Sequence, residues 1–237
     1  GLDYALANNS ITTIIGESRM GKTVSALSWR NRNNHGTSVY VIAPPCGGTK
    51  MFLMRIADAV GVNKNNLSIP QMYLSISRSF NRNRILIVDE AHRLIPSDRR
   101  GDMAKLEILR DLHDNTKCAL ALIATQRFTE ELHKSHYQFE QILGRIGMPI
   151  RLKPNIQQKD IMPIITQYIK NPSKQMITEC SAIANNLGRL GILVETLKVG
   201  SRIASKVKQT MNEKHFFQAI AMRRQMSEGK PLKEKKS

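Results

Sequence analysis

Cysteine is scarce in this sequence. The three cysteines, Cys46, Cys118 and Cys180, form no Cys-x-x-Cys pair and no Cys/His cluster with zinc-ligand spacing. The sequence therefore indicates neither a disulfide framework nor a structural metal site. Cys118 and Cys180 lie in apolar or helical surroundings, and we interpret both as packed thiols.

Long apolar runs are also missing. No stretch approaches the roughly 20 apolar residues that a membrane-spanning helix needs, and the mean hydropathy is −0.32. No signal peptide opens the chain, so we expect no membrane association and a reducing, cytoplasmic location in a bacterial cell. Only ten residues precede the first expected strand, which leaves open whether a leading segment is missing.

Acidic residues are few compared with basic ones. The 237 residues include 36 Lys and Arg against 19 Asp and Glu, a formal net charge of +17. Residues 198–237 alone hold 11 Lys and Arg against 3 Glu. Such an excess favours a polyanionic partner, either nucleic acid or an anionic surface, although a basic but inert surface would have the same composition.

Four short apolar runs alternate with helical patterns in the first two thirds of the chain. Their residues are apolar on both faces, which is typical of strands in a parallel sheet covered by helices on both sides. The sequence thus predicts an α/β fold with strands at residues 11–15, 38–43, 85–88 and 118–124.

The character of the sequence changes near residue 153. Beyond it we find only helical patterns, at 157–168, 173–185, 189–207 and 212–224, with Asn155, Ser173 and Asn212 as candidate caps. We therefore expect an α/β subdomain over residues 1–153 and a helical subdomain over 154–224. Residues 225–237 are Lys-rich without an apolar face, and we expect a disordered basic tail.

The first expected strand runs directly into a phosphate-binding motif. Residues 16–23, GESRMGKT, match GxxxxGK[ST] between a strand and a helix, the context in which the pattern has its meaning. Flexible glycines let successive N–H groups converge on phosphate oxygens at a helix N-terminus. Lys22 would neutralise the β- and γ-phosphates, and the Thr23 hydroxyl would bind Mg²⁺. The predicted nucleotide-binding residues are Gly16, Glu17, Ser18, Arg19, Met20, Gly21, Lys22 and Thr23.

A second motif, ILIVDE at residues 85–90, ends an apolar strand with two carboxylates. We expect Asp89 to hold Mg²⁺ and Glu90 to act as the general base toward the attacking water. Residues 89–92 also spell DEAH, the box of one helicase class. Such helicases need a second nucleotide-fold domain, for which the mostly helical remainder leaves no room.

Three further polar residues are candidates for the same site. Thr125 follows the next apolar strand and would orient the water or sense the γ-phosphate, or else cap the following turn. Arg145 lies in an expected helix at 139–146 and is a candidate arginine finger for a neighbouring subunit, although an isolated Arg is more often a surface residue. Arg189 opens a long helix of the expected helical subdomain and could point back at the nucleotide.

In this order, the motifs resemble an AAA+ ATPase. The resemblance implies that residues 1–153 are the nucleotide-binding α/β subdomain, that residues 154–224 are a helical lid subdomain, and that Arg189 is a sensor of the nucleotide. Within that class, the chain resembles the transposition regulators that include the bacteriophage Mu B protein, TnsC and TniB. The resemblance covers roughly residues 1–224. The segments that carry it are residues 16–23, 85–94 (ILIVDEAHRL), 124–128 (ATQRF), 139–146 (FEQILGRI) and 186–203 (NLGRLGILVETLKVGSRI).

The resemblance implies an ATPase that uses ATP and Mg²⁺ and regulates DNA transposition. Proteins of this family assemble on duplex DNA as filaments when ATP occupies the subunit interfaces, and they activate a transposase. Hydrolysis then drives disassembly. The implied partners are therefore double-stranded DNA, a cognate transposase and further copies of the chain.

Backbone-directed DNA binding requires Lys and Arg rather than base-reading side chains. The resemblance places DNA contacts in the loop after the second strand and around the acidic strand. The predicted DNA-binding residues are Thr49, Lys50, Arg55, Arg99, Arg100 and Lys105, and Arg78, Arg82 and Arg84 are further basic residues of the same segments.

Three other functions remain open at this point. A helicase loader of the IstB and DnaC kind would share the ATPase core but have a shorter lid. An export-associated ATPase of the ExeA type would add a membrane segment and a peptidoglycan-binding region. An ATP-gated scaffold would bind the nucleotide and barely hydrolyse it.

Overall fold

The computed structural model describes residues 1–63, 65–95, 104–134, 140, 142, 144–186 and 189–227. Contacts within the chain divide it into two units. The first contains Gly1–Glu17 and Lys22–Leu152, and the second contains Ser18–Gly21 together with the chain from Lys153 onward. No helix of the described residues has both the length and the apolar character needed to cross a membrane.

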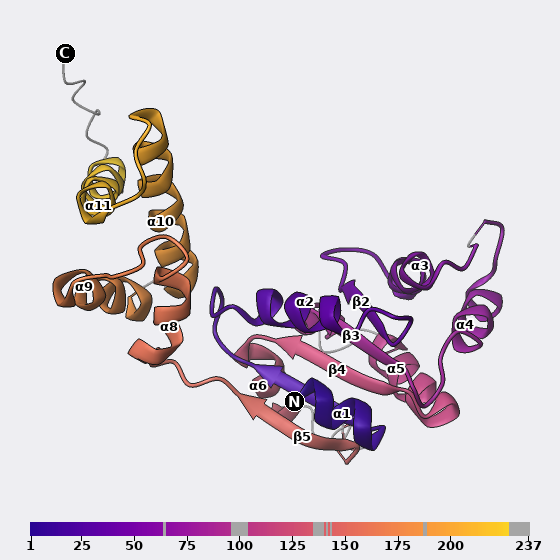
Figure 1. Ribbon diagram of the computed structural model, residues 1–237. Helices are drawn as coiled ribbons and strands as arrows, with labels where there is room; N and C mark the ends of the chain where they lie inside the picture. The colour runs from indigo at the N-terminus through magenta and orange to yellow at the C-terminus, as the bar shows by residue number, and fades with distance from the viewer. Residues whose placement is uncertain are drawn as a thin grey trace. The chain divides into compact units, whose positions relative to one another are not determined.

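The first unit is built on a parallel sheet, as the apolar runs predict, but the sheet has five strands where the sequence predicts four (Figure 1). The strand order is β2-β3-β4-β1-β5, and every neighbouring pair is parallel. The strands are β1 (Ile11–Ile15), β2 (Ser38–Ile42), β3 (Ile85–Asp89), β4 (Ala119–Ala124) and β5 (Ile146–Arg151).

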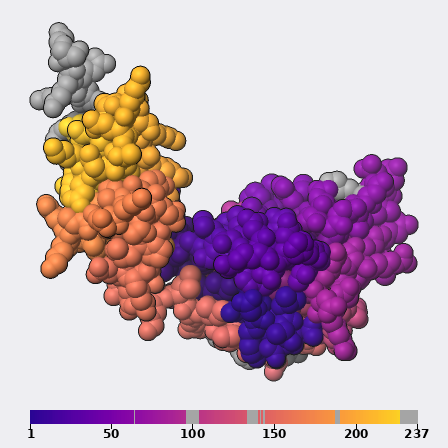
Figure 2. Space-filling view, viewed as in Figure 1, coloured from indigo at the N-terminus to yellow at the C-terminus, as the bar shows by residue number. Residues whose placement is uncertain are grey.

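Helices cover both faces of this sheet because side chains alternate along each strand. On β3, Ile85 and Ile87 pack with α1 and α2, whereas Leu86 and Val88 pack with the helices of the other face. Figure 2 looks onto the α1 and α2 side, where these helices form the indigo and violet surface. The helices are α1 (Leu2–Asn8), α2 (Lys22–Arg32), α3 (Thr49–Val60), α4 (Ile69–Ser77), the 3₁₀ helix η1 (Ala91–Leu94), α5 (Ala104–Thr116) and α6 (Gln126–Lys134).

Strand β5 corrects the prediction of a helix that continues through Ile146. Glu140 and Ile142 are helical, but Gly144 and Arg145 form a turn and the strand follows at once. The pattern missed β5 because the strand contains Gly147 and Pro149 and has no fully buried residue. A proline is tolerated there because β5 is an edge strand.

The second unit is helical and has its own core, which includes Ile161, Met176, Leu193 and Phe216. Its helices are α8 (Gln158–Ile165), α9 (Lys174–Asn185), α10 (Arg189–Lys206) and α11 (Glu213–Ser227). The Ser173 and Asn212 caps are confirmed, since each side chain accepts a backbone N–H of the following turn. The Asn155 cap is wrong, because α8 begins after Gln157. Cys118 and Cys180 are buried and free, as expected of packed thiols, and Cys46 is exposed.

Candidate functional site

The predicted site residues of the first unit gather at one edge of the sheet. In a parallel sheet the carboxyl ends of all strands meet at the same edge, where α/β folds bind ligands. The phosphate-binding motif follows β1, Thr125 follows β4, and Asp89 and Glu90 end β3. These three strands are neighbours, and Gly16 donates its N–H to the Ala124 carbonyl at 3.3 Å. The strand order thus brings together motifs that lie far apart in the sequence.

The motif at residues 16–23 has the backbone of an anion-binding loop. Arg19 and Gly21 have φ values of 61° and 83°, and such left-handed residues turn successive N–H groups toward one concave side. Helix α2 begins at Lys22, so the positive end of its dipole faces the same loop. The Lys22 ammonium donates to the carbonyls of Gly16 at 2.8 Å and Glu17 at 2.6 Å. Burial lowers the pKa of Lys22, although nearby carboxylates oppose the shift.

Asp89 is the most enclosed carboxylate of the site, with 3% of its surface exposed. Its Oδ2 accepts hydrogen bonds from the Thr23 hydroxyl at 2.6 Å and the Tyr40 hydroxyl at 2.7 Å. Its Oδ1 accepts the Glu90 backbone N–H at 2.7 Å. A hydroxyl and a carboxylate side by side are hard oxygen ligands of the kind that Mg²⁺ prefers, so Thr23 and Asp89 fit a magnesium ion bound with a nucleotide.

Tyr40 was missed by the sequence reasoning. Burial and the hydrogen bond to Asp89 raise the pKa of its phenol, so the hydroxyl stays a donor. Its only signal in the sequence is an aromatic residue among the valine and isoleucine residues of β2, and packing in the core would explain that residue equally well.

Glu90 differs from Asp89 in backbone and surroundings. Its φ of 55° and ψ of 34° are left-handed, a strained conformation for a residue other than glycine, and such strain clusters at functional sites. Its carboxylate lies 3.4 Å from His92 Nε2 and 3.8 Å from an Arg93 guanidinium nitrogen. Burial lowers the pKa of His92, which favours the neutral imidazole beside Glu90.

Thr125 is half-buried and directly precedes α6. Its backbone carbonyl accepts the Phe128 N–H at 3.0 Å, so its main chain begins the following turn. Its position between the ends of β3 and β1 keeps it a candidate sensor.

Arg145 lies at the opposite edge of the sheet. It directly precedes β5, whose amino end is the end far from the nucleotide-binding edge. Its Nε donates to Asp114 of α5 at 2.8 Å. Arg145 therefore lies away from the carboxyl ends of the strands, where the other predicted site residues of its own chain gather.

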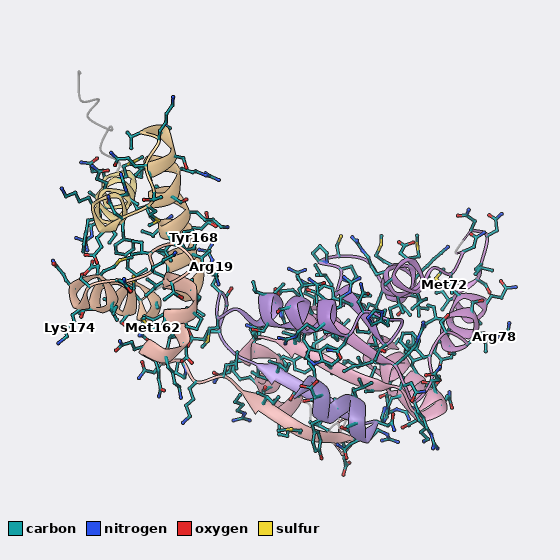
Figure 3. All side chains as sticks on the ribbon, viewed as in Figure 1. Arg19, Met72, Arg78, Met162, Tyr168 and Lys174 are labelled. Atoms are coloured by element: carbon teal, nitrogen blue, oxygen red, sulfur yellow. The ribbon has the colours of Figure 1, made fainter. Side chains whose placement is uncertain are left out.

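The middle of the phosphate-binding loop belongs to the second unit by its contacts. Met20 packs against the core of that unit, and the Gly191 N–H donates to the Arg19 carbonyl at 3.3 Å. Arg19 is labelled in Figure 3. Arg189 is the first residue of α10, and its side chain lies outside the described part of the chain.

The predicted DNA-binding residues that the structure describes occupy two helices. Thr49, Lys50 and Arg55 are on α3, which starts beyond the carboxyl end of β2, with Lys50 and Arg55 exposed and Thr49 half-buried. Lys105 is half-buried in the first turn of α5. Arg99 and Arg100 lie outside the described residues.

The three further basic residues, Arg78, Arg82 and Arg84, lie outside α3 and α5. Arg78, at the outer end of α4, is exposed (Figure 3). Arg82 and Arg84 precede β3 and so lie toward the edge of the sheet away from the nucleotide loop, where Arg84 donates to the Ser79 carbonyl. The structure thus separates them from Lys50.

The sequence model of the AAA domain family matches residues 6–132, more than half of the chain. The chain belongs to the AAA domain family. It is an ATPase of that family, with the α/β fold that its motifs predict.

Two curated relatives align with nearly the whole chain. The ATP-dependent target DNA activator B of Escherichia phage Mu is 25% identical over 224 residues, which are 92% of this chain and 67% of that protein. The protein of the same name from Escherichia phage D108 is 24% identical over the same shares.

Solved structures with low identity share the fold. The ORC2 protein of Aeropyrum pernix superposes with a TM-score of 0.68 at 14% identity, over 93% of this chain and 64% of that one. Domain III of the Thermotoga maritima replication initiation protein DnaA gives a TM-score of 0.57 at 16% identity, over 93% and 88%. The chain spans less than two thirds of the ORC2 chain. At identities this low, the structural similarity shows only that the fold is shared.

Proposed function

We propose that this chain is an ATP-dependent DNA-binding regulator of transposition that assembles on duplex target DNA and activates a transposase. The carrying observation is the alignment over 92% of the chain with two phage proteins named ATP-dependent target DNA activator B. The net charge of +17 supports a polyanionic partner. Lys50 and Arg55, exposed on α3, are cations that can contact phosphates without reading bases.

The carboxyl edge of the sheet supplies the parts that ATP hydrolysis needs. The loop N–H groups and the start of α2 hold the phosphates, and Lys22 neutralises their charge. Thr23 and Asp89 would hold Mg²⁺, which would supply charge neutralisation for the transferred phosphoryl group. Glu90 accepts a proton from the attacking water, and Thr125 orients that water.

In this proposal ATP gates assembly on DNA, and Arg145 completes the nucleotide site of a neighbouring copy. Two copies share a complete site when the nucleotide of one faces Arg145 of the next. Hydrolysis removes the γ-phosphate and with it the contact that joins them, which drives disassembly.

The test measures binding of a fluorescent duplex with a non-hydrolysable ATP analogue, with ADP and without nucleotide, and images the complexes by electron microscopy. We expect filaments or rings and tight binding with the analogue alone. The logarithm of affinity should fall steeply with the logarithm of salt concentration, since each phosphate contact adds about −0.9 to that slope.

The matched variants are Lys22→Ala and Lys170→Ala, which remove the same charge from the nucleotide loop and from an exposed loop of the helical unit. Lys22→Ala should abolish analogue-dependent DNA binding, and Lys170→Ala should leave it nearly unchanged. The proposal would be refuted if the affinity for the duplex were the same with the ATP analogue, with ADP and without nucleotide. It would also be refuted if the chain did not bind the duplex.

A further inference from the structure

Tyr40 is the aromatic residue of β2 and carries its hydroxyl between two valines. Its Cα pairs with Ile87 of β3, two residues before Asp89, so Tyr40 and Asp89 lie on the same face of the sheet. The ring packs at the edge of the core formed with α1 and α2. From there the hydroxyl donates to Asp89 Oδ2 at 2.7 Å.

The Asp89 carboxylate is thereby held from three directions. Thr23 reaches it from α2, Tyr40 from β2, and the Glu90 N–H from its own strand end. Because Asp89 is almost fully buried, few water molecules can replace a lost donor. Its orientation therefore depends on these three hydrogen bonds.

Thr23 and Tyr40 share one acceptor atom but have different freedom. The Thr23 hydroxyl has one proton, which it gives to Asp89, and two lone pairs that remain for a cation. The Tyr40 hydroxyl, by contrast, is attached to a rigid ring that packs against the core. It can therefore hold Asp89 in place while the Thr23 hydroxyl turns toward a metal.

We propose that Tyr40 is a positioning residue that orients Asp89, and through it Thr23, for the Mg²⁺ that accompanies ATP. This inference rests on the ATP site and not on the DNA-binding part of the proposed function. Partners of this kind behind metal ligands typically change metal affinity or activity about 10–100-fold when they are removed.

The test is Tyr40→Phe, which keeps the ring and removes only the hydroxyl. The affinity for a fluorescent ATP analogue is measured with Mg²⁺ and with EDTA, and turnover is measured across a Mg²⁺ titration. We expect the half-saturating Mg²⁺ concentration to rise about 10-fold. Affinity in EDTA should stay at the wild-type level, because the phosphate loop is untouched.

Tyr73→Phe is the matched control. The Tyr73 hydroxyl also donates to a carboxylate, that of Asp111, but it links α4 to α5 away from the site. This variant should keep the wild-type Mg²⁺ dependence.

Three results would overturn the inference. The first is a Tyr40→Phe variant with the same Mg²⁺ dependence as Tyr73→Phe. The second is equal loss of affinity with and without Mg²⁺, which would mark Tyr40 as a packing residue only. The third is a wild-type chain without Mg²⁺-dependent nucleotide binding, which would also remove the ATP site. A wild-type chain that binds ATP with Mg²⁺ but no DNA would refute only the proposed DNA function, and the Tyr40 comparison would still decide this inference.

Discussion

Asp89 and Glu90 are adjacent in the chain but differ in surroundings. Asp89 is buried and accepts three hydrogen bonds, whereas 39% of the Glu90 side chain is exposed. The left-handed backbone at Glu90 turns the chain from β3 into η1. A buried, hydrogen-bonded carboxylate suits metal positioning, and an accessible one suits proton transfer from water.

Glu90→Gln tests that division of labour. The amide keeps the shape but cannot accept the proton, so turnover should fall about 10²–10⁴-fold while ATP affinity stays near wild type. Steady-state phosphate release and nucleotide binding measure the two quantities.

The control for this variant is Glu107→Gln, the same change at a carboxylate of α5 that pairs with Arg110 at 2.8 Å. That pair is partly exposed and should contribute at most about 1 kcal/mol to stability. The turnover of Glu107→Gln should therefore stay at the wild-type rate. A Glu90→Gln variant that hydrolyses at the wild-type rate would contradict the assignment.

At the scale of elements, α9 shows how a local signal and a distant residue combine. The Ser173 hydroxyl accepts the Met176 N–H at 3.2 Å, which is the cap that its sequence predicts. The same hydroxyl donates to Glu213 Oε2 at 2.8 Å, and the Ser173 N–H donates to Glu213 Oε1 at 2.5 Å. The start of α11 is thus fastened to the start of α9.

Ser173→Ala should lower the free energy of unfolding by about 1 kcal/mol, because the cap is lost. Urea unfolding followed by circular dichroism measures the change, and amide hydrogen exchange assigns it to α9 and α11. Ser181→Ala, inside α9, is the matched control and should be neutral or slightly stabilising because alanine is the better helix former. Equal effects of the two variants would show that the cap contributes nothing.

The predicted helices and buried strands depend on local periodicity, and most of them are present within a few residues of their expected ends. Strand β5 was not predicted because Gly147 and Pro149 interrupt the apolar pattern. Helices α1 and α6 were not predicted; α6, Gln126–Lys134, carries mostly polar residues. These three elements form although their local sequence signals are weak, because β5 pairs with β1 and the two helices pack on the sheet.

At the scale of the whole molecule, the role in hydrolysis that we propose for Arg145 requires a second copy of the chain. Arg145→Ala should reduce turnover by several orders of magnitude in the assembled protein, since a supplied arginine adds about 10³–10⁵-fold. ATP affinity of the dilute chain should be unchanged. The readout is turnover at a chain concentration that supports assembly.

Arg110→Ala separates this role from a structural one, because Arg110 and Arg145 both bind the Asp114 carboxylate. Arg110→Ala should keep most of the turnover. Mixing Arg145→Ala with Glu90→Gln should restore part of it, because one interface then combines an intact Arg145 with an intact Glu90. Failure of the mixture to recover activity would argue against a shared site.

The sequence alone determined the phosphate-binding loop, the acidic strand end, the alternation of strands and helices, and the excess of positive charge. These features are encoded within a few neighbouring residues, by spacing, periodicity and composition. Tertiary structure decided the strand order, which sets Thr125 between the two motifs and Arg145 at the far edge. It also placed the Tyr40 hydroxyl on Asp89, 49 positions along the chain. Contacts over such separations depend on how strands pair and side chains pack, which no local pattern specifies.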